Sequence, residues 1–207
     1  MAHRSNATLS LLAAAALALA SCAFPTTGAR GMAVGPHQLP TANAALAGAV
    51  RVNPVRGGRP NGALRPPQIV GSDVEQGLTD SLRSAGLLAP TAADARYAVD
   101  TELVQVDQPF LTEYAEVTSV IHYVLRDLRS GAPLLDRFIE VPYLARGRDA
   151  FRTNDRTQLA NEGSVRESIE TLLYALARLQ VPADATPPAA APAPADAAAS
   201  PPQAFAQ

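Results

Sequence analysis

The chain has 207 residues, a formal net charge of −2 at pH 7 and a hydrophobic fraction of 47%. This near-neutral charge gives no general attraction to polyanions, so we expect no nucleic-acid partner. Tryptophan is absent and aromatic residues make up 5% of the chain, which argues against a cleft that stacks on sugar rings.

Residues 1–22 carry the strongest motif. A short basic start that contains Arg4 is followed by a largely apolar run from Leu9 to Ala20. This order, with small residues at its end, is typical of a secretory signal. The run is too short for a membrane-spanning helix, which needs about 20 apolar residues. We therefore predict a cleaved signal peptide over residues 1–21.

The sequence Leu19-Ala20-Ser21-Cys22 resembles the lipobox of bacterial lipoproteins. The resemblance implies that the Cys22 thiol receives a diacylglycerol, that cleavage precedes it and that its amine is acylated. Cys22 is the only cysteine of the chain, and a free thiol on an exported protein would be a reactive liability. We expect lipidation at Cys22; an ordinary cleaved signal with a chance cysteine is the alternative. The following residue is alanine, not aspartate, which by the same resemblance favours the outer membrane.

Two segments have the composition of linkers. Residues 22–46 are rich in glycine and proline and weakly charged, which predicts a flexible tether of roughly 25–30 Å. Residues 182–207 are dominated by alanine and proline and show no amphipathic period, which predicts a disordered tail. One folded domain is left between them, over residues 47–181.

The first elements of this domain are a strand and a helix. Residues 49–55 alternate weakly before Gly57-Gly58, which predicts a strand, at a sheet edge because of Pro54. Ser72 and Glu75 have the spacing of a capping box, which predicts a helix that begins at Ser72. Gly86 is placed to end it.

Three strands and a long helix follow. Residues 97–103 and 116–126 alternate, and the second strand is apolar on both faces, which favours a central position. A turn at 127–131 leads into a strand over 135–143 and so predicts a hairpin. An apolar stripe over 155–179 predicts the last helix. We expect its Gly163 to approach the sheet closely, with a kink in the helix as the alternative.

This β-α-β-β-β-α order predicts an α+β fold. Four mostly antiparallel strands offer one apolar face, and two amphipathic helices can cover it. The expected architecture is a two-layer sandwich with both helices on one face of the sheet.

The lipobox, the tether and this domain pattern together resemble small envelope lipoproteins of Gram-negative bacteria. The group includes the lipopolysaccharide-assembly lipoprotein and the auxiliary lipoproteins of ABC-type lipid transporters. The matching stretches are residues 74–86, 117–131 and 159–179. Apart from Cys22, the resemblance assigns no functional residue.

We find no motif for catalysis, a metal or a cofactor. His37 lies in the predicted tether, and His122 lies on the outer face of the central strand, where a lone histidine is usually structural. No metal-ligand spacing or phosphate loop occurs. We therefore expect no enzyme activity, no metal and no cofactor.

Two surfaces are candidates for binding. Arg146, Arg148 and Arg152 lie between the last strand and the last helix and can engage an anionic lipid, a lipopolysaccharide phosphate or an acidic partner; internal pairing is the alternative. On the outer face of the sheet we expect Val120, Val124 and Phe138 to be exposed, as a docking patch or as scattered apolar residues.

These features favour a non-enzymatic lipoprotein of the bacterial envelope, on the periplasmic face of the outer membrane. It would be an accessory or docking component in envelope assembly or lipid transport, with an envelope protein or anionic lipid as partner. The alternative is an anchored periplasmic enzyme or small-ligand carrier, which predicts a deep pocket lined by at least two titratable groups.

Overall fold

The computed structural model describes residues 27–59, 67–108, 115–150 and 152–182. Several sequence-based predictions lie outside this part of the chain. They are the signal peptide over residues 1–21, the lipobox Leu19, Ala20 and Ser21 with the lipidated Cys22, and the tail beyond residue 182.

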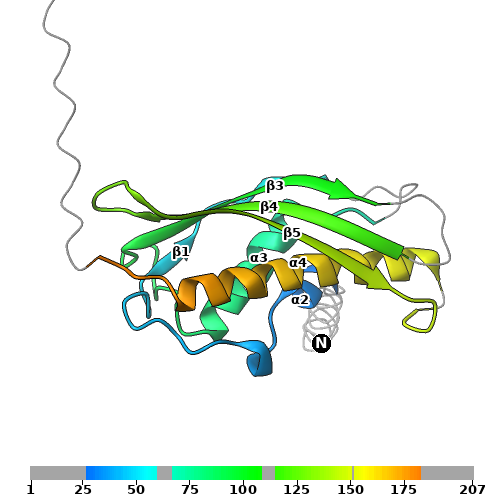
Figure 1. Ribbon diagram of the computed structural model, residues 1–207, viewed down its shortest axis with the longest axis horizontal. Helices are drawn as coiled ribbons and strands as arrows, with labels where there is room; N and C mark the ends of the chain where they lie inside the picture. Colours follow the sequence, from blue (N-terminus) through cyan, green and yellow to red (C-terminus); the bar gives the residue numbers. More distant parts are fainter. Residues whose placement is uncertain (1–26, 60–66, 109–114, 151, 183–207) are drawn as a thin grey trace, which may run out of the picture.

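The domain is built on one mixed sheet (Figure 1). Its long strands β3 (Tyr97–Asp107), β4 (Ala115–Asp127) and β5 (Pro133–Ala145) form an antiparallel meander. The short strands β1 (Val50–Val52) and β2 (Arg56–Gly57) both pair with β3 in parallel. β4 is central, as its two apolar faces indicated, but the sheet is mixed and not mostly antiparallel.

Two helices cover the inner face of this sheet, α3 (Gly71–Ser84) and α4 (Thr153–Ala177). α4 runs along β4 and β5, and α3 packs beside it against β1 (Figure 1). The core between the layers contains fully buried residues of both helices and of the sheet, among them Leu78, Tyr97, Ile121 and Leu172. The predicted α+β sandwich is therefore confirmed.

The segment that we expected to be a flexible tether is in large part folded. Residues 27–46 contain α2 (Thr27–Met32) and the short 3₁₀ helix η1 (Pro36–Gln38). Met32, Val34 and Leu46 are buried in the main core. These few apolar residues follow no helical or strand period, so their composition alone gave no sign of packing.

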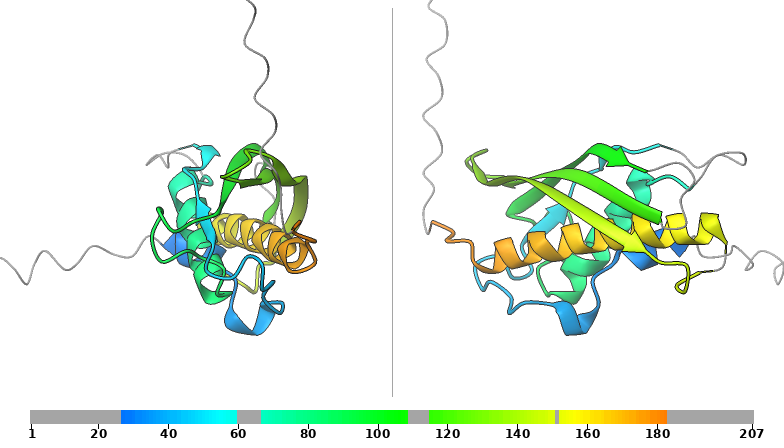
Figure 2. Two further views of the ribbon diagram at one scale, coloured as in Figure 1. Left: turned by 90° about the vertical axis from the view of Figure 1, so that its left-hand side faces the viewer. Right: turned by 45° about the vertical axis from the view of Figure 1, so that its right-hand side comes forward.

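Hydrogen bonds fix the same segment to both helices. The backbone N–H of Val34 donates to the Ser81 hydroxyl of α3 at 2.9 Å. The Asn43 amide donates to the carbonyls of Leu176 and Leu179 at 3.0 and 2.7 Å, and so satisfies carbonyls at the end of α4. Both views of Figure 2 show this segment below α3 and α4, on the side away from the sheet.

The predicted capping box at the start of α3 is wrong. α3 begins at Gly71 with Val70 as its N-cap residue, and no side chain caps it. The Glu75 carboxylate instead accepts a hydrogen bond from the backbone N–H of Val55 at 3.3 Å. A Cβ on Gly71 would lie 2.9 Å from the Gly57 carbonyl oxygen, so the helix start is set by its close approach to β2.

Candidate functional site

The face of the sheet that points away from the helices, here called the outer face, is open to solvent. Residues on β5 alternate, so that Ile139 and Val141 are buried while Phe138 and Glu140 are exposed. On β3 a bulge after Leu103 inserts one residue, and the alternation therefore places both Val104 and Gln105 on the outer face.

Phe138 is the most exposed large apolar side chain of this face, at 64%. Its ring stacks on the His122 imidazole of β4, with ring centroids 4.1 Å apart and planes 3° from parallel. His122 Nε2 is hydrogen-bonded to Asp136 Oδ1 at 2.7 Å. The expectation that Phe138 is exposed is therefore confirmed, and His122 takes part in holding its ring in place.

Val120 and Val124 flank His122 on the same strand. Val120 is half-buried, whereas Val124 is only 5% exposed, so the expectation that both are exposed is wrong for Val124. Val124 pairs with Asp100 on one side and with Asp136 on the other, and these larger neighbours in the adjacent strands surround it. The apolar part of the outer face is thus narrower than the sequence indicated.

Carboxylates surround this apolar part. The outer-face positions of the three long strands carry Asp100, Glu102, Asp107, Glu116, Asp136 and Glu140. Three of these carboxylates form hydrogen bonds with other side chains. Asp100 accepts from Asn53 and Arg126, and Glu102 accepts from Arg56. Asp136 is hydrogen-bonded to His122. Within the described residues, Asp107, Glu116 and Glu140 form no ion pair or side-chain hydrogen bond.

The paired carboxylates are satisfied inside the molecule. Burial raises the pKa of Asp100, but the hydrogen bonds from Asn53 at 2.7 Å and Arg126 at 2.9 Å outweigh it, and the pKa falls below its ordinary value. The charge available to a partner therefore comes mainly from Asp107, Glu116 and Glu140.

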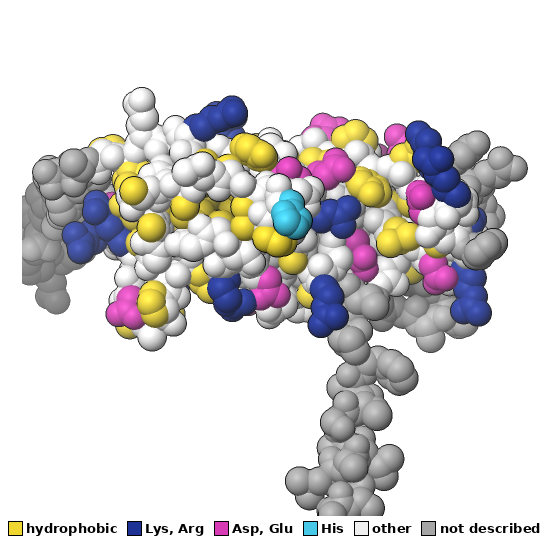
Figure 3. All heavy atoms as spheres, turned by 90° about the horizontal axis from the view of Figure 1, so that it is seen from below, with side chains coloured by type: hydrophobic (Ala, Val, Ile, Leu, Met, Phe, Trp, Pro, Cys, Tyr) yellow, Lys and Arg dark blue, Asp and Glu magenta, His cyan; other side chains and the backbone are white. Residues whose placement is uncertain are grey.

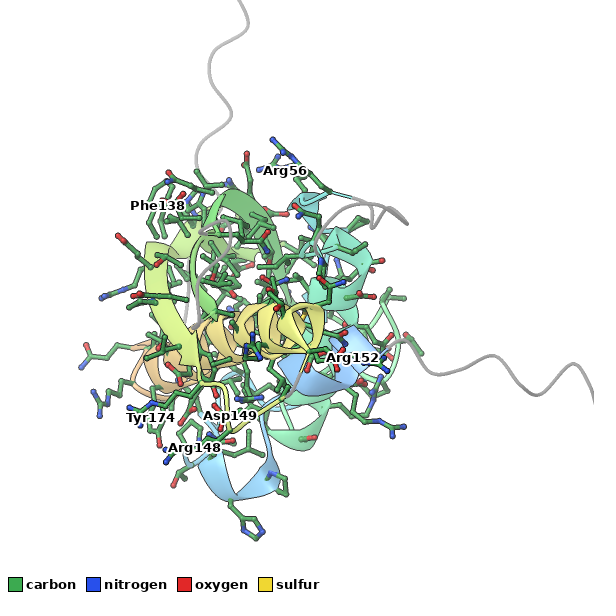
Figure 4. All side chains as sticks on the ribbon, turned by 90° about the vertical axis from the view of Figure 1, so that its right-hand side faces the viewer. Arg56, Phe138, Arg148, Asp149, Arg152 and Tyr174 are labelled. Atoms are coloured by element: carbon green, nitrogen blue, oxygen red, sulfur yellow. The ribbon has the colours of Figure 1, made fainter. Side chains whose placement is uncertain are left out.

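The three arginines predicted as an anion-binding surface do not form one cluster. The Asp149 carboxylate accepts a hydrogen bond from the backbone N–H of Arg146 at 2.7 Å and lies 3.9 Å from Arg148 Nε. Arg152 is the N-cap residue of α4. Figure 4 shows Arg148 beside Asp149 and Arg152 well away from both. Anion binding by these residues stays a prediction.

α2 and the loop after β5 lie on the same side of the molecule, here called the helix side (Figures 1 and 2). α2 packs mainly against α3 and α4. Figure 3 views the molecule from this side, where the arginines stand apart from one another among acidic and hydrophobic side chains. Because α3 and α4 cover the inner face of the sheet and α2 lies beyond them, the helix side is opposite to the outer face (Figure 1).

Two carboxylates lie against the glycines of α2. The Asp73 carboxylate of α3 occupies the space beside Gly28, and the Glu162 carboxylate of α4 occupies the space beside Gly31. Burial raises the pKa of both groups, and the negative charge of Asp73 raises that of Glu162 further. Gln158 and Arg166 partly oppose the rise at Glu162. These two contacts hold α2 against α3 and α4.

A cavity of about 290 Å³ opens beside the bulge of β3. The described residues that line it come from the stretch after β2 and from β3. The enzyme or carrier alternative predicted a pocket with at least two titratable groups. Arg59 is the one charged side chain in the described lining of this cavity, and the alternative itself stays a prediction.

Among the described residues, no three histidine, cysteine, aspartate or glutamate side chains are grouped closely enough to hold a metal ion. His37 lies in η1, far from His122 in the sequence and on another layer of the fold. No helix in the described ranges is long and apolar enough to cross a membrane.

No family model matches the chain, and no curated protein matches it. Among solved structures it is similar to protein XCC0632 from Xanthomonas campestris, of family DUF330, with 13% identity and a TM-score of 0.47 over 66% of this chain and 90% of that one. A lipoprotein candidate from Caulobacter crescentus has 16% identity and a TM-score of 0.45 over 62% and 87%. A minor lipoprotein from Acinetobacter baumannii has 10% identity and a TM-score of 0.36 over 62% and 90%.

These neighbours include bacterial lipoproteins but none described as a lipopolysaccharide-assembly lipoprotein, so that finer resemblance remains an expectation. Identities and TM-scores this low carry no functional information.

Sequence reasoning missed the acidic outer face as a unit. It singled out Val120, Val124 and Phe138 on this face but did not place the carboxylates of β3 beside them. The signal was available, because Asp100 and Glu102 alternate with the buried Val99, Thr101 and Leu103 and must share one face. What the sequence could not supply was the register that brings them beside His122 and Phe138.

Proposed function

We propose that this chain is a non-enzymatic lipoprotein of the bacterial envelope, anchored through Cys22 in the outer membrane with its domain in the periplasm. It acts as an accessory component that docks onto an envelope protein in envelope assembly or lipid transport. The position of α2 carries this proposal, because it determines which side of the domain a lipid at Cys22 would hold toward the bilayer.

Thr27, the first residue of α2, is five positions after Cys22. Five residues span at most about 18 Å when fully extended. A lipid on Cys22 would therefore keep α2, and with it the helix side, close to the bilayer. The outer face of the sheet would then point away from the membrane and be accessible to a protein partner.

The distribution of charge supports the same orientation. The loop with Arg146 and Arg148 lies on the helix side, where anionic headgroups would attract it. The outer face instead carries three carboxylates that have no side-chain partner among the described residues, and an anionic bilayer would repel them. The helix side carries acidic side chains as well (Figure 3), so the charge argument rests on the arginines of this loop and on the three carboxylates of the outer face.

The anchor is tested by cell fractionation and acyl labelling. The natural chain is expected in the outer-membrane fraction with palmitate incorporated, and Cys22→Ser is expected in the aqueous periplasmic fraction without label. A natural chain that is water-soluble and carries a free thiol would refute the proposal.

The orientation is tested separately in the lipidated chain. Because Cys22 is the only cysteine and is consumed by the lipid, a second cysteine can be labelled selectively. A fluorophore at Arg30→Cys, on the exposed side of α2, is expected to be quenched by spin-labelled lipids more strongly than one at Phe138→Cys. Equal quenching, or stronger quenching at position 138, would contradict the orientation.

A further inference from the structure

We infer that the outer face of the sheet, centred on Phe138, binds a protein surface that presents lysine or arginine around an apolar recess. This inference rests on the proposed function and names the docking surface and the chemistry of the partner.

Phe138 is suited to anchor such a contact. One face of its ring is covered by the His122 imidazole, and Asp136 holds that imidazole through its Nε2. The ring is thus fixed in the free protein although 64% of the residue is exposed. Binding a rigid aromatic side chain costs little conformational entropy, and such residues dominate the energy of many interfaces.

Apolar and acidic residues lie next to this ring in the pattern of an interface with a polar rim. Glu140 follows two positions along β5 and pairs with Val120 of β4, and Val104 lies beside Val120 in the bulge of β3. An apolar recess on the partner can accept Phe138, while basic groups around it meet the carboxylates.

The free carboxylates select the charge of the partner. Arg56, Arg126 and His122 already bond Glu102, Asp100 and Asp136, whereas Asp107, Glu116 and Glu140 have no such partner within the described residues. A basic surface would gain attraction from Glu140, which lies next to the ring. It would also gain attraction from Asp107 and Glu116, which lie further along the same face, at the level of Thr118 and Leu144. Anionic headgroups would be repelled, and so would the same face of a second copy.

A photocrosslinking residue at Val104 tests the inference in cells that express the full lipidated chain. Val104 is 50% exposed and adjoins the patch without being its anchor. A matched residue at Tyr174, 40% exposed on α4, reports on the helix side (Figure 4). The expected result is an adduct with an envelope protein from position 104 and not from position 174, mapped by mass spectrometry to a peptide rich in lysine or arginine.

Two variants then connect the adduct to the named residues. Phe138→Ala and, separately, Glu140→Arg are each expected to lower the yield from position 104 about tenfold, which corresponds to about 1.4 kcal/mol. Tyr174→Ala and Glu167→Arg, at exposed positions of α4, are the matched controls and are expected to leave the yield unchanged. Unfolding curves of all four proteins show whether the domain remains folded.

Any of four results would overturn the inference. They are adducts from position 104 only with lipid, only with another copy of the chain, or with a protein peptide that lacks basic residues, and the absence of any adduct. Outer-membrane fractionation of the same cells separates this failure from failure of the proposed anchor. If the chain is found in the outer membrane but forms no adduct, only the assignment of the docking surface is refuted.

Discussion

The ring of Tyr143 on β5 lies directly against the backbone of Gly163 on α4. A Cβ at position 163 would be 2.5 Å from Cε1 and Cζ of that ring, closer than two carbon atoms can pack. This close approach confirms the expectation that Gly163 faces the sheet. α4 therefore rests on β5 at a distance that leaves no room for a Cβ at position 163 unless the Tyr143 ring moves.

We predict that Gly163→Ala destabilises the domain. Alanine favours the helix by about 1 kcal/mol, but overpacking typically costs about 1–3 kcal/mol, so we expect a net loss of about 1 kcal/mol in urea unfolding. Gly147→Ala is the control, because no atom lies within 4 Å of a Cβ at that position. A Gly163→Ala protein as stable as the natural chain would show that the ring simply moves aside.

The sequence predicted the elements whose periodicity is strong and local. The alternation in β4 and the apolar stripe of α4 are long, and each identified its element and its buried face within a few residues. The outer-face position of His122 followed from the same alternation. These features depend on residues that are close in the sequence, which is why one amino-acid sequence was sufficient to predict them.

The features that the sequence did not predict depend on contacts between distant segments. α2 is six residues long, contains two glycines and gains its stability from burial of Met32 and from contacts with α3 and α4. The parallel pairing of β1 with β3 and the start of α3 at Gly71 are also set by tertiary contacts. The binding patch likewise needs the register of three strands.

Asp127 should be the carboxylate on which the β4–β5 turn depends. It is 2% exposed, and its side chain accepts hydrogen bonds from the backbone N–H groups of Arg129 and Ser130 and from Arg96. Removing it leaves these donors unsatisfied, so Asp127→Ala is expected to cost about 2–3 kcal/mol in urea unfolding. Asp94→Ala, in an exposed turn, is the control; an equal effect of both would refute the assignment.

Asp127 also predicts a loss of stability in acid. Burial alone would raise its pKa, but the three hydrogen bonds together hold the pKa below its ordinary value of 3.8. The stabilisation is therefore present above the unfolded pKa near 3.8 and is lost as the pH falls through the folded pKa. Asp127→Asn should flatten this acid limb of the stability curve, and a curve with an unchanged slope below pH 4 would contradict the prediction.

Glu162 should affect stability with the opposite sign. Burial raises its pKa above 4.5 in the folded protein, so the folded state favours the protonated carboxyl. This contribution is greatest below the unfolded pKa and is lost as the pH rises through the folded pKa. Glu162→Gln keeps an acceptor for Gln158 and removes the cost of burying a charge, together with the repulsion from Asp73, while it loses the attraction of Arg166. Because burial is the largest of these effects, we expect the variant to raise stability at pH 7 by on the order of 1 kcal/mol.

The control for this prediction is Glu167→Gln, an exposed position of the same helix, which is expected to have no comparable effect. The comparison needs urea unfolding at about pH 4 and pH 7, because the difference between the Glu162 variant and the natural chain should grow with pH. A variant that is less stable at pH 7 would instead show that the ionised carboxylate holds α2 in place.

Arg146, Arg148 and Arg152 should contribute to membrane association from the helix side. Each arginine near an anionic surface is worth about 1 kcal/mol, and Asp149, which lies 3.9 Å from Arg148 Nε, offsets part of this for Arg148. In a Cys22→Ser chain, where no lipid dominates the affinity, replacing all three with glutamine is expected to weaken binding to phosphatidylglycerol vesicles about tenfold. The matched control replaces Arg56 and Arg126 with glutamine, since these pair with Glu102 and Asp100 on the opposite side of the domain. Binding that is unchanged in the triple variant, or weakened equally in the control, would show that these arginines serve only the fold.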